Sequence, residues 1–455
     1  MRCTRVSREG LFRDGRDLIP LSVWLPRATS MKTDKHPWFR SRGYLHFDFP
    51  VNQKKAEEIL SLPENVAMHS FFPFIDYEVE SMKIKKNEST GKIDKKIKKR
   101  PIAYAAHVDS HIYSFYAWKL SQLYEDQLKV RGIDRSVLAF RSLGKSNVDF
   151  AHQAFQDISL IGECATIALD ITGFFDNIDH RLLKSQWCKL LQTKSLPEDH
   201  YAVFSSLTKY AKVSRDALYE EFGISEQNPK AGRRRICTPQ EFRTRVRDKG
   251  LIRVHDKACG IPQGSPISAL LSNIYMLDFD SAIAKRIAGV DRKYYRYCDD
   301  MLLIVSKFEV GDVIGEVNAE IEKLKITINA NKTQVSKFDY HNSKLVADKP
   351  LQYLGFLFDG ARTMLRSSAL ARYSDRMRRG VRHAKQARDK FNVLRAGKGL
   401  APRKLYRRKL YEKYSHLGRR NFVTYALRAA RIMGSKTMRK QIRSLWIRLQ
   451  QEIEK

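Results

Sequence analysis

The stretch YYRYCDDMLLIV at 294–305 sets two adjacent carboxylates, Asp299 and Asp300, between two runs that are typical of β-strands. Like charges side by side resist joint ionisation, so the pair is unfavourable in a sheet unless a cation compensates it. A turn between the two strands would lift both carboxylates to the rim of the sheet. Mg²⁺ prefers hard oxygen ligands and shares its coordination shell with substrate phosphates. The stretch therefore predicts a metal-binding turn between paired strands.

A third carboxylate stands upstream of this pair. The segment ALDITGFFDNIDH puts Asp170 at the end of an apolar, strand-like run over 164–171. Two divalent ions about 4 Å apart can activate a 3′-hydroxyl and stabilise a leaving pyrophosphate. That mechanism usually needs a carboxylate from a second segment, and Asp170 meets the need. Asp176 and Asp179 fall in the following turn and helix start, where we interpret them as capping or solvated carboxylates.

The charge of the chain indicates its class of partner. Its 455 residues include 84 Lys and Arg against 50 Asp and Glu, a formal net charge of +34. Such an excess favours polyanions, most commonly nucleic acid, with an anionic membrane as the competing interpretation. No run of about 18 apolar residues could span a bilayer, and the N-terminus lacks an apolar signal segment, so we expect a cytoplasmic protein without a membrane partner. The six scattered cysteines include no CxxC pair, which favours reduced thiols over zinc or disulfides.

Apolar periodicity predicts a series of elements along the first 360 residues. Residues 83–100 are strongly basic around Gly91 and fit either a hairpin or a solvated loop. Residues 208–256 are polar and basic without a sustained period, and we interpret them as an insertion with a small helix near 216–222. Helices are expected at 51–62, 105–128, 180–193, 265–286 and 312–325, and a strand at 351–358.

The region from residue 361 onward differs in composition. It holds 28 Lys and Arg but only 5 Asp and Glu. Glycines interrupt its helical patterns, which predict helices at 368–394, 403–415, 421–433 and 436–454. Several helices with this imbalance favour a track for a nucleic-acid duplex that is contacted mainly through its phosphates.

Five motifs in sequence order resemble the palm of reverse transcriptases. They are D-x-x-x-x-F at Asp170 to Phe175, GIPQGSPIS at 260–268, Y-x-D-D at Tyr297 to Asp300, ITINANKTQ with Lys332, and YLGF at 353–356. Upstream, KKRPIAY at 98–104 and AFRSLGKSNVDFA at 139–151 are similar to finger motifs of the same family. The resemblance covers about 95–360.

The resemblance implies roles for named residues. Asp170, Asp299 and Asp300 would be the catalytic carboxylates and would hold two Mg²⁺ ions, with Mn²⁺ as a possible substitute. The ring of Phe175 would stack on the sugar of a dNTP and collide with a 2′-hydroxyl. The other nucleotide-binding residues would be Lys98, Arg100, Arg141, Gln263, Gly264 and Lys332, of which Lys332 would serve the leaving pyrophosphate. The primer grip would be formed by Tyr353, Leu354 and Gly355. For each basic residue, a solvated surface charge remains the alternative.

The same resemblance implies an α+β fold of the right-hand polymerase type. Its parts would be an N-terminal extension at 1–50, fingers at 51–163, a palm with an antiparallel sheet at 164–357, and a basic helical thumb at 358–455. The basic insertion at about 208–256 would belong to the palm. The partners would be an RNA template, an RNA/DNA hybrid and dNTPs.

Within the family, the chain most resembles the bacterial, defence-associated reverse transcriptases of the unassigned group, which often copy a structured non-coding RNA. The stretch LFDGARTML at 357–365 stands where retron enzymes typically carry VTG. We therefore expect an RNA-directed DNA polymerase in antiviral defence against phage. The alternatives are a group II intron-type or retron enzyme or maturase that acts as an RNA-binding factor, and an RNA-dependent RNA polymerase. The aromatic Phe175 argues against an RNA-dependent RNA polymerase, and the intact carboxylate set argues against a non-catalytic maturase.

Overall fold

The protein is described by a computed structural model that covers residues 36–86 and 93–455. All described helices and strands belong to one compact unit, Trp38–Lys455. The described part is a mixed α+β fold, as the sequence predicted. Three sheets are present in it, with five, four and three strands.

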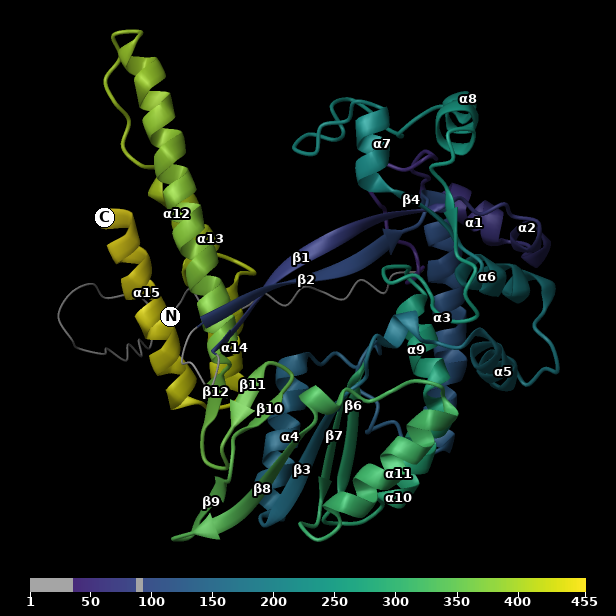
Figure 1. Cartoon of the computed structure of the whole chain (residues 1–455), viewed down its shortest axis with the longest axis vertical. Coiled ribbons are helices and arrows are strands. Elements are labelled where there is room, and N and C mark those ends of the chain that lie inside the picture. Colours follow the sequence, from purple (N-terminus) through teal and green to yellow (C-terminus); the bar gives the residue numbers. More distant parts are fainter. Residues whose placement is uncertain (1–35, 87–92) are drawn as a thin grey trace, which may run out of the picture. The chain divides into compact units, whose positions relative to one another are not determined.

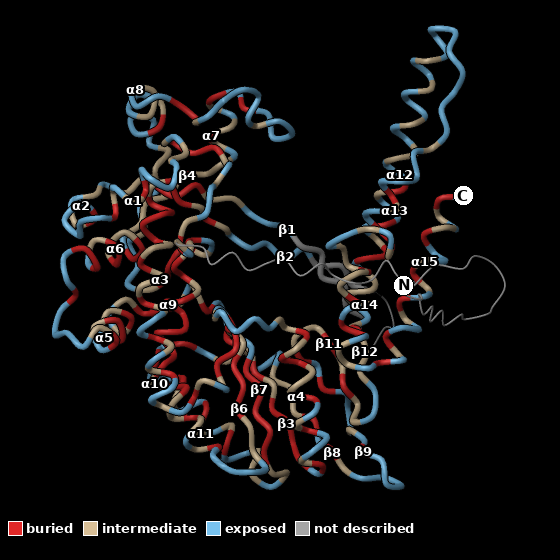
Figure 2. Tube along the Cα trace, turned by 180° about the vertical axis from the view of Figure 1, so that it is seen from behind, coloured by how far each residue is buried: buried red, intermediate tan, exposed pale blue. Residues whose placement is uncertain are grey.

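The five-stranded sheet is antiparallel throughout, in the order β6-β7-β3-β8-β9 (Figure 1). Its strands are β6 (Lys293–Tyr297), β7 (Asp300–Val305), β3 (Cys164–Asp170), β8 (Gln334–His341) and β9 (Lys344–Ala347). Successive side chains of a strand point to opposite faces. Accordingly, Ile167 and Leu169 of β3 join one apolar core, whereas Cys164 joins another. Because both faces of β3 and β7 are covered, these two strands read as continuous apolar runs and are buried in Figure 2.

Helices and a small sheet cover the two faces. The first core includes residues of α3 (His107–Val130), α5 (His180–Leu191), α6 (Glu198–Thr208), α9 (Ser268–Tyr275), α10 (Leu277–Arg286) and α11 (Val310–Lys323). The second includes residues of α4 (Asn147–Ile161), of the sheet β10 (Leu351–Tyr353), β11 (Phe356–Phe358) and β12 (Thr363–Leu365), and of α12 (Ser367–Ala396), α13 (Arg407–Tyr414), α14 (Phe422–Ile432) and α15 (Lys436–Glu454). The four C-terminal helices predicted from the sequence are thus confirmed, as are the helices at 105–128, 180–193 and 312–325.

The basic segment 83–100 is a hairpin rather than a solvated loop. Strands β1 (Phe74–Lys86) and β2 (Ile93–Tyr104) pair in antiparallel register, and the expected turn at Gly91 lies outside the described residues. Residues of the insertion extend this sheet, because β4 (Ala211–Ser214) pairs in parallel with β1 and β5 (Arg253–Val254) follows β4. By hydrogen bonding, the insertion therefore goes with the hairpin and not with the five-stranded sheet.

The insertion also has an apolar core of its own. Val213, Leu218, Ile236 and Val246 are buried together with Phe47, which comes from the segment before β1. The remaining elements are short: α1 (Gln53–Leu60), α2 (Pro63–Ala67), α7 (Arg215–Glu221), α8 (Pro239–Glu241), the single turns η2 (Phe174–Asp176) and η4 (Ala330–Lys332), and the π-helix η3 (Phe242–Arg247). The helices expected at 51–62 and near 216–222 are confirmed by α1 and α7.

Two expected elements differ from prediction. The single strand expected at 351–358 is a hairpin of β10 and β11, because Leu354 and Gly355 have φ of 44° and 97° and reverse the chain. The left-handed region suits a two-residue hairpin turn and is strained for leucine. The single helix expected at 265–286 is two helices, α9 and α10, which meet at Met276.

Two further expectations concern membranes and thiols. Among the described helices, none combines the length and the apolar character that a bilayer span requires. Five of the six cysteines lie within the described residues, and all five are free thiols. Cys3 lies outside the described residues.

Candidate active site

The three predicted carboxylates come together at one end of the five-stranded sheet. Asp170 is the last residue of β3 and Asp300 the first of β7, and the two are direct partners across the antiparallel pair. Tyr297 pairs with Asp300 across β6 and β7, so Cys298 and Asp299 form a two-residue turn. The carbonyl of Asp299 accepts a hydrogen bond of 3.2 Å from the amide of Ile171, which joins this turn to the end of β3.

The turn depends on a strained residue. Cys298 has a φ of 61°, a conformation that costs energy for any residue with a Cβ and that suits the first position of a tight hairpin. Its side chain is buried, and burial raises the pKa of its thiol, with further contributions from Asp299. Cys298 is therefore a neutral packing residue under the turn. The surrounding contacts must hold this conformation.

Arg296 supplies one of those contacts, and sequence analysis missed it. Its guanidinium is fully buried and forms hydrogen bonds of 2.7 and 2.5 Å to the two carboxylate oxygens of Asp280 in α10. A third bond, of 3.2 Å, goes to the carbonyl of Cys298, and a fourth, of 3.1 Å, to the side chain of Asn273. The only signal in the sequence was a cation inside the strand-like run YYRY. Arg296 thus holds the carbonyl of the strained turn from behind.

The carboxylate of Asp300 is repelled by the carboxylates of Asp299 and Asp170. Burial raises the pKa of its carboxyl to about 6, and repulsion by Asp299 and Asp170 adds to the shift. Two cations oppose the repulsion. Lys332 forms an ion pair with Asp170, and the positive charge of Arg366 lowers the pKa of Asp300.

Arg366 is a second residue that sequence analysis missed. It precedes α12, and its Nε is buried without a hydrogen-bond partner among the described residues. Burial lowers the pKa of its guanidinium, as does neighbouring Arg372, whereas Asp300 raises it. The N-terminus of α12 is therefore electrostatically coupled to the carboxylate site.

The glycine-containing turn at 260–268 packs on the basic hairpin. The carbonyl of Gln263 accepts a hydrogen bond of 2.8 Å from the amide of Ala103 in β2. Gly264 has a φ of 120°, and a Cβ there would stand only 2.6 Å from the carbonyl oxygen of Ala103 and 3.1 Å from Ile102. Only glycine allows this approach.

That contact orients the basic residues of β2. Residues two apart lie on the same face of a strand, so Arg100 and Lys98 share the face of Ile102 that meets the turn. Both are exposed. Phe175 belongs to the same neighbourhood, because its carbonyl accepts a 2.9 Å bond from the amide of Ile261, and its side chain is half-buried.

Arg141 makes contacts within the protein that the resemblance did not imply. Its guanidinium donates to both carboxylate oxygens of Glu125, at 2.8 and 2.6 Å, and to the carbonyls of Asp134 and Val137. Only 3% of the side chain is exposed. These contacts occupy the donors of Arg141 within the protein, which argues against a nucleotide-binding role.

The segment Tyr353–Gly355 forms the turn between β10 and β11. The carbonyl of Leu354 accepts a 3.1 Å bond from Asn147 in α4, and Asn147 also donates to the hydroxyl of Tyr425 in α14, at 2.9 Å. The hydroxyl of Tyr353 is buried without a partner among the described residues, and burial followed by the charge of Asp300 raises its pKa. This turn therefore joins the carboxylate site to the C-terminal helices.

Asp176 and Asp179 were interpreted from the sequence as capping or solvated carboxylates. The side chain of Asp179 accepts bonds from the amides of Arg181 and Leu182 and so caps α5, as predicted, and it also pairs with Lys325 at 2.7 Å. Asp176 is exposed in the turn. Neither is needed to explain the carboxylate cluster.

The donor chemistry of the site fits a hard divalent cation. Two carboxylates at the adjoining ends of β3 and β7 and one in the turn before β7 are the ligand type that Mg²⁺ and Mn²⁺ take. Within the residues that the structure describes, however, no three acidic, imidazole or thiol groups already converge on one point. One oxygen of the Asp170 carboxylate accepts a hydrogen bond from the ammonium of Lys332, which is thus a competitor for a metal at this residue. A metal at Asp170 would therefore have to share this carboxylate with Lys332 or displace the ammonium.

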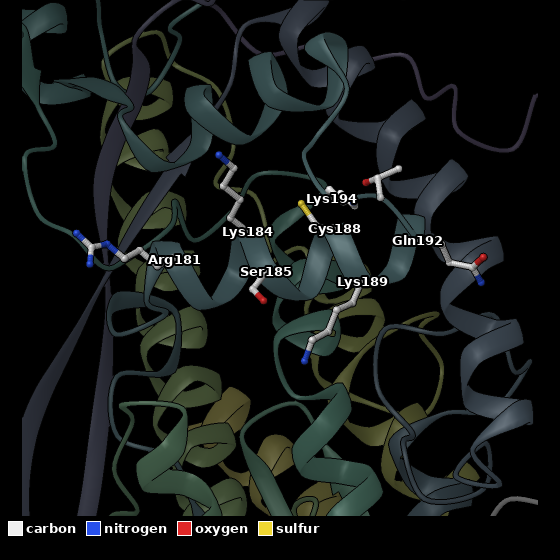
Figure 3. A pocket seen from close by; sticks show the side chains of 8 residues that line it. Arg181, Lys184, Ser185, Cys188, Lys189, Gln192 and Lys194 are labelled. Carbon is white, nitrogen blue, oxygen red and sulfur yellow. The ribbon is translucent and has the colours of Figure 1, made fainter.

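A separate basic hollow of about 630 Å³ lies on α5 and the turn after it (Figure 3). It is lined by Arg181, Lys184, Ser185, Cys188, Lys189, Gln192, Thr193 and Lys194. Lys189 points away from Lys184 and is paired with Asp278 at 2.8 Å, and Lys184 lies over the ring of Tyr201. Because its cations do not converge, we assign this hollow no role in the chemistry.

Comparison with known proteins gives the family. No curated protein matches the chain. Among solved structures, an apo telomerase from Candida tropicalis truncated from its C-terminal domain has a TM-score of 0.42 and 12% identity, over 69% of this chain and 60% of that one. A second apo telomerase from Candida tropicalis has a TM-score of 0.41 and 12% identity, over 71% and 54%. The telomerase from Candida albicans in complex with a fragment of telomeric RNA has a TM-score of 0.38 and 11% identity, over 89% and 66%.

The chain thus spans less than two thirds of the length of each of these telomerases. The family model described as reverse transcriptase (RNA-dependent DNA polymerase) matches residues 84–358. That range holds the carboxylate site, the glycine-containing turn and the basic hairpin from Ile84 on, and it is more than half of the chain. The protein therefore belongs to the reverse transcriptase family, the RNA-dependent DNA polymerases.

Proposed function

We propose that the whole protein is an active RNA-directed DNA polymerase, which adds dNTPs to the 3′ end of a primer on an RNA template. The observation that carries this proposal is the register of β3 and β7, which sets Asp170 opposite Asp300 with Asp299 in the adjoining turn. Carboxylates that had no catalytic task would be separated or neutralised, because their repulsion is costly.

Asp170, Asp299 and Asp300 are the residues that would hold the divalent ions. When bound, such ions stabilise the charge that develops on the transferred phosphate. Lys332 neutralises Asp170 in the metal-free protein. Once displaced, its ammonium remains near the site, where it can donate a proton to the leaving pyrophosphate.

The nucleotide would lie between the hairpin and the carboxylates. Arg100 and Lys98 would bind its triphosphate through charge-assisted hydrogen bonds. Gln263 and Gly264 would approach the base pair, and Phe175 would select deoxyribose through its ring. Arg141 is omitted from this set because its guanidinium is occupied by Glu125.

The right-hand description then assigns the parts as follows. The hairpin and α3 belong to the fingers within 51–163, the five-stranded sheet to the palm within 164–357, and the basic helices from 358 to the thumb. The insertion at 208–256 would serve the fingers, because β4 pairs with β1. The thumb would hold an RNA/DNA hybrid through its phosphates, with the turn Tyr353–Gly355 as primer grip.

The finer biological assignment rests on the resemblance alone. We propose a bacterial, cytoplasmic enzyme that acts in phage defence and copies a structured non-coding RNA. A maturase that only binds RNA remains the alternative. Cells that carry the variant Asp299→Ala decide between these roles: lost protection supports synthesis in defence, whereas intact protection or intact RNA splicing contradicts it.

The activity itself is tested with purified protein, a DNA primer annealed to RNA, dNTPs and Mg²⁺. Primer extension is expected from the wild type and is expected to disappear in Asp170→Ala. Asp291→Ala is the matched control, because Asp291 is exposed in the loop before β6. Extension by Asp170→Ala at the wild-type rate would contradict the proposal.

A further inference from the structure

The second half of α12 stands apart from the core. The buried residues of this 30-residue helix lie at Tyr373, Ser374, Met377 and Val381, all in its first half. All of 382–409 is described, and no residue in it is buried. A bond of 2.9 Å from Lys385 to the carbonyl of Glu452 is its last tie to α15. Figure 2 accordingly colours the far end of α12 mostly as exposed. We refer to residues 386–406 as the arm.

The arm is held together by its own contacts. After the helix ends, the chain turns at Gly399 and runs back along α12. Asn392 bonds the backbone of Arg403 twice, at 3.0 and 2.8 Å, and the Nε of Arg395 donates to the carbonyl of Ala401 at 2.8 Å. The arm therefore has a defined shape although it lacks a core.

The charge of the arm is almost entirely positive. It holds six Lys and Arg and one acid, Asp389, and that acid is paired with the adjacent Arg388 at 2.7 Å. Arg407, Arg408 and Lys409 follow directly. Concentrated like charge destabilises a compact state through self-repulsion. A polyanion removes that cost, so the arm is complementary to nucleic acid.

Exposed apolar groups accompany these cations. The exposed fractions are 48% for Phe391, 67% for Leu394, 49% for Leu400 and 60% for Tyr406. The guanidinium of Arg403 lies 5.9 Å from the centre of the Phe391 ring. Aromatic rings and guanidinium planes beside cations are the groups on which unpaired RNA bases stack. An acidic protein would satisfy the charge but would leave this combination unexplained.

The arm is also far from the chemistry. The helix begins next to Arg366, which interacts with Asp300, and its 30 residues at 1.5 Å each give a length of about 45 Å. At the 3.4 Å per base pair of a B-form duplex, that length corresponds to roughly 13 base pairs, and an A-form RNA duplex, whose rise is smaller, fits a few more. The tip of the arm therefore cannot touch the nucleotide that is being added.

We propose that the arm is a docking surface for structured RNA, which it holds by phosphate contacts and by stacking of unpaired bases on Phe391 and Tyr406. The choice of RNA as the occupant rests on the proposed function. By this inference, the arm anchors the template RNA about a dozen base pairs from the carboxylates and favours templates that have unpaired bases at that distance.

Binding to a fluorescent RNA hairpin with an unpaired loop, without dNTPs or divalent metal, tests the charge. The arm variant is Lys390→Gln/Lys398→Gln/Lys404→Gln. The control is Lys285→Gln/Lys344→Gln/Lys349→Gln, which removes the same charge from exposed positions on α10, β9 and the loop after β9. The arm variant should lose about 10-fold or more in affinity at about 0.15 M salt, and its plot of log affinity against log salt should flatten by about 3. Equal losses in both variants, or no loss in the arm variant, would overturn the proposal; the latter would favour a protein partner.

A second variant, Phe391→Ala/Tyr406→Ala, tests stacking. It should bind the looped hairpin about 10-fold more weakly and a blunt RNA duplex as the wild type does. Equal effects on both RNAs contradict stacking, and equal binding of the hairpin and its DNA counterpart by the wild type contradicts the commitment to RNA. Helicity by circular dichroism checks the fold. Because no synthesis is measured, a protein that fails to extend primers would refute the proposed function and leave this result intact.

Discussion

The carboxylate end of the five-stranded sheet and the arm of α12 treat charge in opposite ways. At the sheet, three acids are fixed by strand register, and a fully buried ion pair of Arg296 and Asp280 stands behind them. On the arm, none of the cations is buried, and the partners that some of them have, such as Asp389 beside Arg388, are exposed as well. The difference teaches that charges which act on a reacting atom need exact placement by buried neighbours, whereas charges that gather a polyanion need only be exposed and numerous.

If the ion pair of Arg296 and Asp280 holds the turn at Cys298 and Asp299 in position, breaking this pair should have the largest effect on the stability and activity of the carboxylate site. Arg296→Met leaves Asp280 buried without its cation, which should lower the free energy of unfolding by about 3–5 kcal/mol. Arg296→Met/Asp280→Leu removes both charges and should regain most of that stability, as measured by urea unfolding. Primer extension should stay impaired in the double variant, because the bond to the carbonyl of Cys298 is gone. Full activity there would mean that Arg296 only stabilises the fold.

Lys332 tests whether a cation near the acids has a chemical task. Lys332→Gln should reduce the maximal rate of incorporation by about 100-fold, the lower end of the effect of a proton donor. It should also lower the Mg²⁺ concentration at half-maximal rate, because no ammonium then competes for Asp170. Lys325→Gln, which removes a similarly exposed lysine paired with Asp179, is the control. Unchanged rate and unchanged metal dependence would assign Lys332 to the surface.

A substitution of Phe175 tests whether its ring stacks on the sugar of the incoming nucleotide. Phe175→Ala should raise the use of rNTPs relative to dNTPs by about 10-fold or more, because the collision with the 2′-hydroxyl is removed. Phe175→Leu keeps part of the side-chain volume, so its use of rNTPs relative to dNTPs should lie between those of the wild type and Phe175→Ala. The ratio of kcat/KM for the two nucleotides measures the effect. An unchanged ratio in Phe175→Ala would end the role of this ring as a sugar gate.

The smallest effect on chemistry is expected from the arm. On a primer and template shorter than about 10 base pairs, the stacking variant Phe391→Ala/Tyr406→Ala should change the single-turnover rate less than 2-fold, because Phe391 lies about 36 Å along α12 from the end of the helix that is next to the carboxylates. A large loss on such short substrates would show that the arm acts at the site itself and would remove the contrast between the two regions.

Most of the five-stranded sheet and its carboxylate site could be predicted from the sequence. Apolar runs that adjoin aspartates located β3, which ends at Asp170, and β7, which begins at Asp300, and the motif order located the glycine-containing turn. The ion pair of Arg141 could not be predicted, because its partner Glu125 lies 16 residues away on another element and only the fold brings them together. The same holds for Arg296, whose partner Asp280 comes from α10.

Regions with irregular apolar spacing were harder. The buried residues Val213, Leu218 and Ile236 follow no helical or strand period, so the insertion looked like a polar loop although it has a core. The run LQYLGFLF looked like one strand because a leucine with positive φ has no signature in sequence. For α12, the helical pattern was visible, but nothing in it told where the core would end and the arm begin.

One variant measured in two assays tests the central claim most directly. Asp299→Ala should extend an RNA-templated primer at least about 1,000-fold more slowly than the wild type, because the transferred phosphate loses the charge stabilisation that the carboxylate site supports. Its affinity for the RNA hairpin should be unchanged within about 2-fold, because the exposed cations are intact. Extension at the wild-type rate, or parallel loss of RNA binding in a folded variant, would contradict the division between an acidic site for chemistry and a basic surface for binding.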